Sequence, residues 1–391
     1  MVIFSLQKGV AVKLQTESLI VSVLIILAGI GALELGFSSS IFEILGGVFA
    51  SNVLKLGELH WIDFLSNLGL LGLMFFAGLE TDPELMKKHF LKSLFIGFSS
   101  FFFPLISVFY FSHYVLHYSF EASLLIGIAL STTSLALVYP LLKEKGLLKH
   151  AAGQVLLAAA MVVDISSMMT MSFLFEGINI YNLLFAVALV LLLVKLPKWG
   201  EQLFERYTGN QIEFKTRFIL LVLVALGFLS DTVHINEAVL AFTTGIFFAE
   251  LFRKDHLIEK KIRAIIFGFL APFFFFKAGY SVKLSVVSWK VIFLSLFLGT
   301  VAFLTKYIGT IYATANLFKG AVYKLAGLFF NMRLTFGIVA SVFGLKSGII
   351  DEETYVALLL IIVVTSLIAS VISNRLPHEV EEDILEDIFK I

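Results

Sequence analysis

The chain has 391 residues, of which 59% are apolar and only 15% are charged, and its formal net charge is zero. A soluble domain of this length could not cover so much apolar surface, and the mean hydropathy of +0.96 indicates a protein that lies mostly in lipid. The zero net charge provides no basic field for nucleic acid, and the absence of cysteine excludes disulfides, thiolate metal sites and cysteine nucleophiles.

Apolar runs of about 20 residues recur nearly from end to end, and each is long enough to cross roughly 30 Å of hydrocarbon. Residues 1–16 lack the short apolar core and small-residue cleavage site of a signal peptide, so we expect the first span to direct insertion. The predicted spans are 18–37, 39–54, 63–79, 93–116, 121–142, 151–175, 179–197, 214–230, 235–252, 264–282, 288–312, 321–344 and 354–374.

These runs predict an all-α polytopic membrane protein with about thirteen transmembrane helices. The second span is short and leaves almost no loop after the first, so twelve spans remain an alternative. We expect a transmembrane domain over residues 1–376 and a short acidic, solvated tail over 377–391.

The distribution of Lys and Arg in the loops predicts the orientation, because these residues favour the cytoplasmic side. With the N-terminus outside, the cytoplasmic loops include those around 87–92, 143–149 and 253–263, which are rich in Lys and Arg. We therefore expect an outside N-terminus and a cytoplasmic C-terminus in a protein integral to the cell (inner) membrane.

Asp164, near the middle of the sixth span, is the clearest candidate for chemistry, because an ionisable side chain costs a few kcal/mol inside a bilayer. A buried carboxylate can exchange protons near neutrality, and when deprotonated it can bind a cation. We predict that it is a proton or ion site. The alternative is an acid that pairs with a cation and only fixes helix packing.

Three cationic residues fall inside predicted spans and need partners or water. Lys306 is the best candidate counter-charge for Asp164, although it could instead extend to the cytoplasmic headgroups. Lys277 lies within reach of the outer interface, so extension to the headgroups is about equally favoured. Arg333 either stabilises an irregular helix or handles ions directly.

Two spans contain polar runs at mid-membrane: Ser131, Thr132, Thr133 and Ser134 in the fifth, and 331–335 in the twelfth. We predict that both helices are broken there, because transporters build cation sites from exposed backbone carbonyls and helix ends. The alternative is an intact helix in which the hydroxyls bond to their own backbone.

Other signals are weaker. His113 and His117 have the spacing of a metal pair but lack a third ligand, so we expect no resident metal. No Gly-rich phosphate loop is present, which gives no support to ATP-driven pumping, and no cofactor is expected.

Several segments, taken in order, resemble the monovalent cation:proton antiporters of the Kef and Na⁺/H⁺ exchanger type. The matching segments are 43–47 (Glu-Ile-Leu-Gly-Gly), 75–80 (Phe-Phe-Ala-Gly-Leu-Glu), 131–135, 153–164 with Asp164, 272–279, Lys306 and 331–350. The likeness covers nearly the whole chain.

The resemblance implies inverted repeats, two broken crossing helices, and separate dimerisation and core parts that move by an elevator-like mechanism in a homodimer. It implies that Asp164 carries the ion, that Thr132, Thr133 and Ser134 help to form the cavity, and that Lys306 competes for the carboxylate. The family's usual Asp, Asn or Gln before the essential Asp is Val163 here. One titrating carboxylate would carry one proton or one monovalent cation, so we hypothesise electroneutral exchange.

The sequence therefore predicts a secondary transporter that exchanges Na⁺ or K⁺ for H⁺, and not an enzyme. An alternative is a transporter of an anion or organic solute on the same fold, favoured by three intramembrane cations against one central acid. A non-transporting membrane sensor is a further alternative. An intramembrane protease would need a second catalytic aspartate, which we do not find.

Overall fold

A computed structural model describes residues 2–35, 38–57, 59–79, 90–134, 137–138, 141–142, 147, 150–175, 206, 213–233, 237–254, 256–318 and 322–375. Every secondary-structure element with assigned bounds in these ranges is a helix. The α-helices are α1 (Val2–Leu35), α2 (Ser39–Asn52), α3 (His60–Leu79), α5 (Phe90–Tyr110), α6 (Phe120–Ser131), α8 (Ala151–Phe175), α10 (Phe214–Val233), α11 (Glu237–Lys254), α12 (His256–Ile265), α13 (Ala271–Tyr280), α14 (Trp289–Thr314), α15 (Val322–Phe329), α16 (Leu334–Lys346) and α17 (Glu352–Arg375). Two π-helical turns, η1 (Phe111–Val115) and η3 (Ile266–Leu270), and a 3₁₀ turn, η4 (Leu284–Val286), complete the set.

Within the described ranges, eight helical segments are long and apolar enough to cross a membrane. They are 15–35, 60–79, 90–115, 151–171, 257–280, 289–314, 322–346 and 352–369. The predicted span at 179–197 and the tail at 377–391 lie outside the described residues, so the number thirteen stays a prediction. Because 322–346 is interrupted at 330–333, length alone understates how irregular these spans are.

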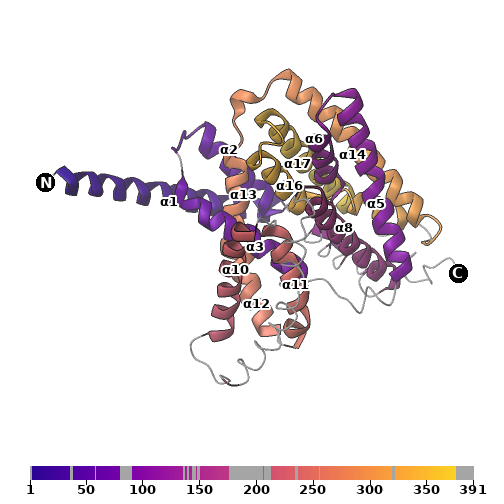
Figure 1. The fold of residues 1–391 in the computed structure, drawn as a ribbon, viewed down its shortest axis with the longest axis horizontal. Coiled ribbons are helices and arrows are strands. Elements are labelled where there is room, and N and C mark those ends of the chain that lie inside the picture. The colour runs from indigo at the N-terminus through magenta and orange to yellow at the C-terminus, as the bar shows by residue number, and fades with distance from the viewer. Residues whose placement is uncertain are drawn as a thin grey trace.

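The described helices form two groups that lie side by side (Figure 1). We call α1–α3 with α10–α13 the first helix group, and α5, α6, α8 and α14–α17 the second helix group. Each helix makes most of its contacts inside its own group: α3 packs on α11 and α13, whereas α5 packs on α6, α8 and α14. The boundary between the groups is where the site described below lies.

Two helices of the second group, α6 and α14, begin at serine side-chain caps. Ser119 Oγ accepts a hydrogen bond from the Ala122 N–H (3.2 Å), and Ser288 Oγ accepts one from Val291 (3.3 Å). These caps satisfy amide groups that have no partner within the helix. They fix where α6 and α14 begin.

A proline shapes the end of α13 that faces the second group. Pro272 lacks an N–H, and its ring conflicts with the carbonyl four residues earlier. The π-helical turn η3 directly precedes this proline and widens the helix. The turn carries Phe267, which becomes part of the site.

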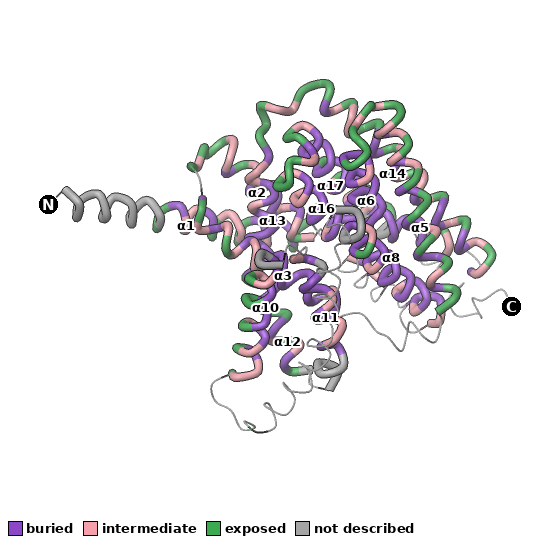
Figure 2. The backbone as a smooth tube through the Cα atoms, in the orientation of Figure 1, coloured by how far each residue is buried: buried purple, intermediate pink, exposed green. Residues whose placement is uncertain are grey.

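Burial differs strongly between helices (Figure 2). The described side chains of α8 are mostly buried, and α8 is apolar around most of its circumference, as expected for a helix enclosed by others. The span of α1 at 15–35 is largely exposed, and the beginning of this helix protrudes from the rest of the molecule (Figure 1). Its exposed apolar side chains face lipid or a second protein.

Polar contacts between described residues connect the two groups at the end of α13 and α16, the start of α17 and the first half of α3. The Lys346 ammonium donates to the Asn67 side-chain oxygen (3.2 Å), and the Tyr355 hydroxyl donates to the Ala278 carbonyl (2.9 Å). Lys283, just after α13, pairs with Glu352 (2.6 Å). We call these contacts the end clasp.

Candidate functional site

The first break in a helix occurs directly after Ser131. The Ser131 hydroxyl donates to the Gly127 carbonyl (2.6 Å), and the Thr132 hydroxyl donates to Ala129 (3.2 Å). The backbone then becomes extended at Thr132, with φ −68° and ψ 163°. The chain thus leaves α6 with its last carbonyls unused by the helix itself.

The second break separates α15 from α16 at 330–333. The Asn331 amide donates back to the Gly327 carbonyl (2.9 Å), and the Arg333 N–H donates to Ser366 Oγ on α17 (3.3 Å). Arg333 precedes α16 without capping it through its side chain. The first turn of α16, with its N–H groups, therefore lies inside the protein.

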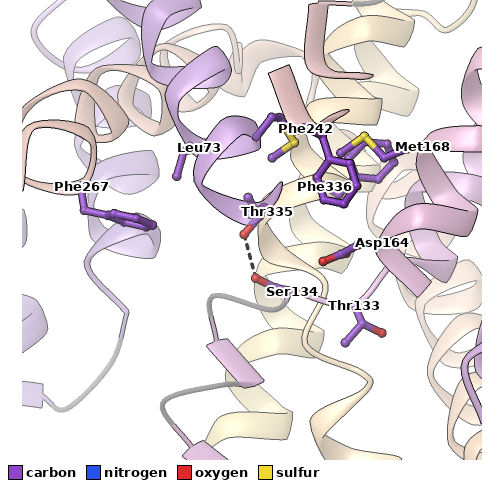
Figure 3. Close-up of a pocket in the computed structure, with 11 residues that line it drawn as sticks. Leu73, Thr133, Ser134, Asp164, Met168, Phe242, Phe267, Thr335 and Phe336 are labelled. Atoms are coloured by element: carbon purple, nitrogen blue, oxygen red, sulfur yellow. Dashed lines mark hydrogen bonds between the residues drawn. The ribbon is translucent and has the colours of Figure 1, made fainter. Parts of the chain in front are cut away.

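The two breaks cross and hydrogen-bond to one another. The Thr133 hydroxyl donates to the Phe330 carbonyl (3.1 Å), and the Ser134 N–H donates to Met332. The Ser134 and Thr335 hydroxyls share a hydrogen bond of 2.7 Å (Figure 3). Because both breaks contribute partners, neither can shift without disturbing the other.

A cavity lies beside this crossing, at the boundary between the helix groups. Its empty volume is about 400 Å³, including the part that is open to the outside. The first group lines it with Leu73, Met74, Ala77, Phe242 and Phe267, and the second group lines it with Thr133, Ser134, Asp164, Met168, Thr335 and Phe336. Every polar lining side chain therefore comes from the second group.

Asp164 projects from α8 into this cavity, and only 6% of its surface is exposed (Figure 3). The neighbouring hydroxyls of Ser166 and Ser167 donate to carbonyls of their own helix, at 2.7 Å each. They are thus not oriented toward the carboxylate. Among the described residues that line the cavity, Asp164 is the single ionisable one.

Lys306 lies behind the first break and is fully buried. Its ammonium donates to the carbonyls of Ser131 and Ser100, the latter at 3.3 Å. Asp164 and Arg333 are close enough for their charges to act on Lys306. Lys306 therefore connects α14 to the broken end of α6, and it lies within electrostatic range of Asp164.

Arg333 is also fully buried, and its bonding is incomplete. Nη2 donates to the Asn331 side chain and, at 3.5 Å, to the Ala302 carbonyl. Nε and Nη1 have no hydrogen-bond partner. The second break thus contains a guanidinium with spare donors.

Lys277 lies elsewhere. Its ammonium pairs with the Asp63 carboxylate at 2.7 Å, and 28% of its side chain is exposed. It also lies 5.8 Å from the centre of the Tyr280 ring. The structure does not bring Lys277 to the cavity.

Thr335 is a cavity residue that the sequence alone did not single out, although it lies within the predicted break at 331–335. The sequence feature that could have identified Thr335 is the presence of one hydroxyl residue at each break, Ser134 at the first and Thr335 at the second. No group of three or more His, Cys, Asp or Glu suited to a metal ion occurs among the residues that the structure describes. His113 Nδ1 instead lies 3.0 Å from the Tyr118 carbonyl.

A polytopic helical bundle with crossed broken helices and a buried acid between two helix groups has the architecture of a secondary transporter. A family model described as "Sodium/hydrogen exchanger, transmembrane" matches residues 19–376. The chain belongs to this family and is a multi-pass integral membrane protein.

Relatives from bacteria and archaea match most of the chain. A probable Na⁺/H⁺ antiporter 3 of Methanocaldococcus jannaschii is 28% identical, over 87% of this chain and 89% of the relative. A Na⁺/H⁺ antiporter of Enterococcus hirae is 26% identical, over 84% of this chain and 90% of the relative. The Na⁺/H⁺-K⁺ antiporter GerN of Bacillus cereus is 24% identical, over 88% and 90%.

The fold is similar to a solved structure, that of the sodium proton antiporter MjNhaP1 from Methanocaldococcus jannaschii at pH 8. The TM-score is 0.69, and the match covers 96% of this chain and 99% of the other at 15% sequence identity. This likeness supports the all-helical antiporter fold.

Proposed function

We propose that the protein exchanges a monovalent cation, Na⁺ or K⁺, for H⁺ by alternating access. One observation carries the proposal: Asp164 is the single ionisable residue lining a cavity where two broken helices cross. The relatives named above are Na⁺/H⁺ and Na⁺/H⁺-K⁺ antiporters, which supports this choice of substrates.

In the proposed cycle, Asp164 binds either a proton or a cation. On one side of the membrane the cation binds as the proton leaves, and on the other side a proton binds as the cation leaves. Since Val163 contributes no second charge, the carrier crosses with the same net charge in both loaded forms. We therefore propose electroneutral 1:1 exchange.

We propose that the first helix group is the dimerisation part and that the second helix group is the moving core. The proposed homodimer is supported by exposed apolar residues of α1 that alternate at spacings of four and three: Leu19, Val23, Ile26, Ile30 and Leu33. Native mass spectrometry checks the proposal, and a single copy in lipid nanodiscs would contradict it.

We also propose an outside N-terminus, which external labelling of a Lys8→Cys variant checks.

The proposed exchange is tested in proteoliposomes that contain a pH-sensitive dye. Adding Na⁺ or K⁺ outside is expected to drive protons out of wild-type vesicles, and Asp164→Asn is expected to abolish this flux. Ser167→Ala is the matched control, because this buried hydroxyl on the same helix bonds to the Val163 carbonyl. Flux that survives in Asp164→Asn sinks the proposed role of the carboxylate.

The same vesicles test electroneutrality. An imposed membrane potential is expected to leave the equilibrium proton gradient unchanged, because equal charges cross in opposite directions. A gradient that follows the potential rules out 1:1 exchange.

A second candidate function is transport of an anion or an organic solute. The spare Arg333 donors and the buried Lys306 ammonium near them favour it, since two buried positive charges favour a negative partner. Proton-coupled uptake of an anion without any cation dependence would support this second candidate over the first.

A further inference from the structure

The Thr335 hydroxyl is a polar group on the cavity wall whose role the exchange reaction alone does not explain. We infer that Thr335 is a direct oxygen ligand of the transported cation, opposite Asp164, and that it tunes the choice between Na⁺ and K⁺. This inference rests on the proposed function and names a specificity-determining residue within it.

The position of Thr335 suits a ligand. It lies in the first turn of α16, where the helix begins inside the protein, and lines the same cavity as Asp164 (Figure 3). A helix N-terminus repels cations, so a cation here needs oxygens that offset this dipole. The Thr335 hydroxyl is the side-chain oxygen that α16 contributes to the cavity lining.

The hydrogen bonds leave the required lone pairs available. A hydroxyl donates one hydrogen and carries two acceptor lone pairs. The Thr133 hydrogen goes to the Phe330 carbonyl, and Ser134 and Thr335 share one hydrogen between them. All three oxygens therefore keep at least one lone pair for a cation.

The remaining wall supplies little else. Seven of the eleven lining residues, Leu73, Met74, Ala77, Met168, Phe242, Phe267 and Phe336, have apolar side chains. A cation that leaves water for such a cavity must replace its hydration shell with protein oxygens. A carboxylate alone cannot surround it, so each neutral hydroxyl contributes to affinity.

A neutral oxygen also discriminates between ions. The smaller Na⁺ loses more hydration energy than K⁺ on entering the site and depends more on each replacement ligand. Removing one oxygen should therefore weaken the binding of Na⁺ more than the binding of K⁺. A proton on Asp164 needs no such ligand.

A purely structural role for Thr335 is the competing explanation, because its bond to Ser134 connects the two breaks. Thr335→Val keeps the shape and removes the oxygen, and Thr335→Ser keeps the oxygen and removes a methyl group. Ser341→Ala is the matched control: Ser341 is buried on the same helix, and its hydroxyl donates to Gly337 (2.8 Å) outside the cavity lining.

The experiment measures cation-driven proton flux against Na⁺ and K⁺ concentration in proteoliposomes. Thr335→Val is expected to raise the KM for Na⁺ about tenfold and that for K⁺ less, with Vmax within about twofold of wild type. Thr335→Ser is expected to restore the KM for Na⁺, and Ser341→Ala to change neither constant.

Several outcomes overturn the inference. One is an unchanged KM for Na⁺ in Thr335→Val, and another is an equal rise in KM for Na⁺ and K⁺ in that variant. A third is a lower Vmax at constant KM in both Thr335→Val and Thr335→Ser. Calorimetric titration of Na⁺ into the purified protein repeats the test without transport, and Thr335→Ala replaces Thr335→Val there if the valine variant does not fold. Absence of cation-driven flux in wild type contradicts the proposed function itself, whereas a normal wild type with an unaffected variant contradicts the role of Thr335 alone.

Discussion

At the scale of single residues, the electrostatics behind the cavity distinguish this site from a simple carboxylate pocket. Lys306 reaches the carbonyls of α6 and α5 and does not line the cavity, yet its charge acts within range of Asp164. Burial makes such charge interactions stronger than in water. In the proposed exchange, the lysine therefore biases the competition between proton and cation for Asp164 without contacting either ion.

Lys306→Gln tests this influence. Removing a positive charge near a carboxylate favours the protonated form, so protons should displace the cation at a higher pH than in wild type. We expect the pH of half-maximal flux to rise, by on the order of one pH unit. The dye assay at a series of pH values measures it.

Lys324→Gln is the control, because Lys324 is an exposed lysine on α15. This substitution lowers the formal net charge of the protein by the same amount as Lys306→Gln. A pH profile of Lys306→Gln that overlies wild type would show that Lys306 acts only as a structural donor.

The sequence could predict some of these residues and not others. Asp164 stood out because charge is costly in a span, and the cavity also includes Thr133 and Ser134 from the predicted break. Lys277 stood out for the same reason. Its partner Asp63 lies on α3, which is far from α13 in the sequence, so no local pattern identifies this pair. Thr335 carries no charge, so only the crossing of the two breaks reveals it.

At the scale of elements, close approach of helix backbones positions the apolar wall of the cavity. A Cβ added at Gly245 on α11 would lie 2.0 Å from the Phe75 carbonyl oxygen, and one added at Gly78 on α3 would lie 2.1 Å from that of Phe242. Small residues permit such packing in membranes. The contact fixes Ala77 and Phe242 against the site.

Gly245→Ala should therefore destabilise the protein, because the obstacle is backbone and cannot rotate away. We expect a loss of about 1–3 kcal/mol, typical of overpacking, seen as a lower midpoint in thermal unfolding of the detergent-solubilised protein. Gly29→Ala is the control, since a Cβ there meets nothing within 4 Å. Equal midpoints for Gly245→Ala and wild type would contradict the packing argument.

Helix patterns were more predictable than helix irregularities. Both breaks lie where polar residues interrupt an apolar span, hydroxyls at 131–134 and Asn331 with Arg333 at the second break, so both could be anticipated from the sequence. The π-helical turn η3 could not, because it depends on how α13 packs against α3 as well as on Pro272. Hydropathy detects a span but not a change of helical pitch within it.

At the scale of the whole molecule, the end clasp holds the two helix groups together near one end, whereas the cavity lining includes Ala77 near the opposite end of α3. In the proposed alternating access, opening at the clasp end requires these contacts to separate. Locking them should stop transport.

The absence of native cysteine makes this testable without background labelling. We expect a bifunctional, reducible thiol reagent to block flux in an Asn67→Cys/Lys346→Cys variant and a reductant to restore it. A Lys290→Cys/Glu353→Cys variant is the control, because this ion pair (2.9 Å) joins two helices of the second group. Full flux in the cross-linked Asn67/Lys346 variant would show that the groups need not separate there.

The division of the cavity wall has a consequence for coupling efficiency. The described lining residues of the first helix group are all apolar, so in the proposed exchange a charged Asp164 carboxylate moving past them would lose its hydration without gaining a polar partner. Asp164 carrying a proton or a cation is neutralised and meets a much smaller barrier. The wall would thus suppress slippage, in which the empty carrier returns alone and dissipates one ion gradient without building the other.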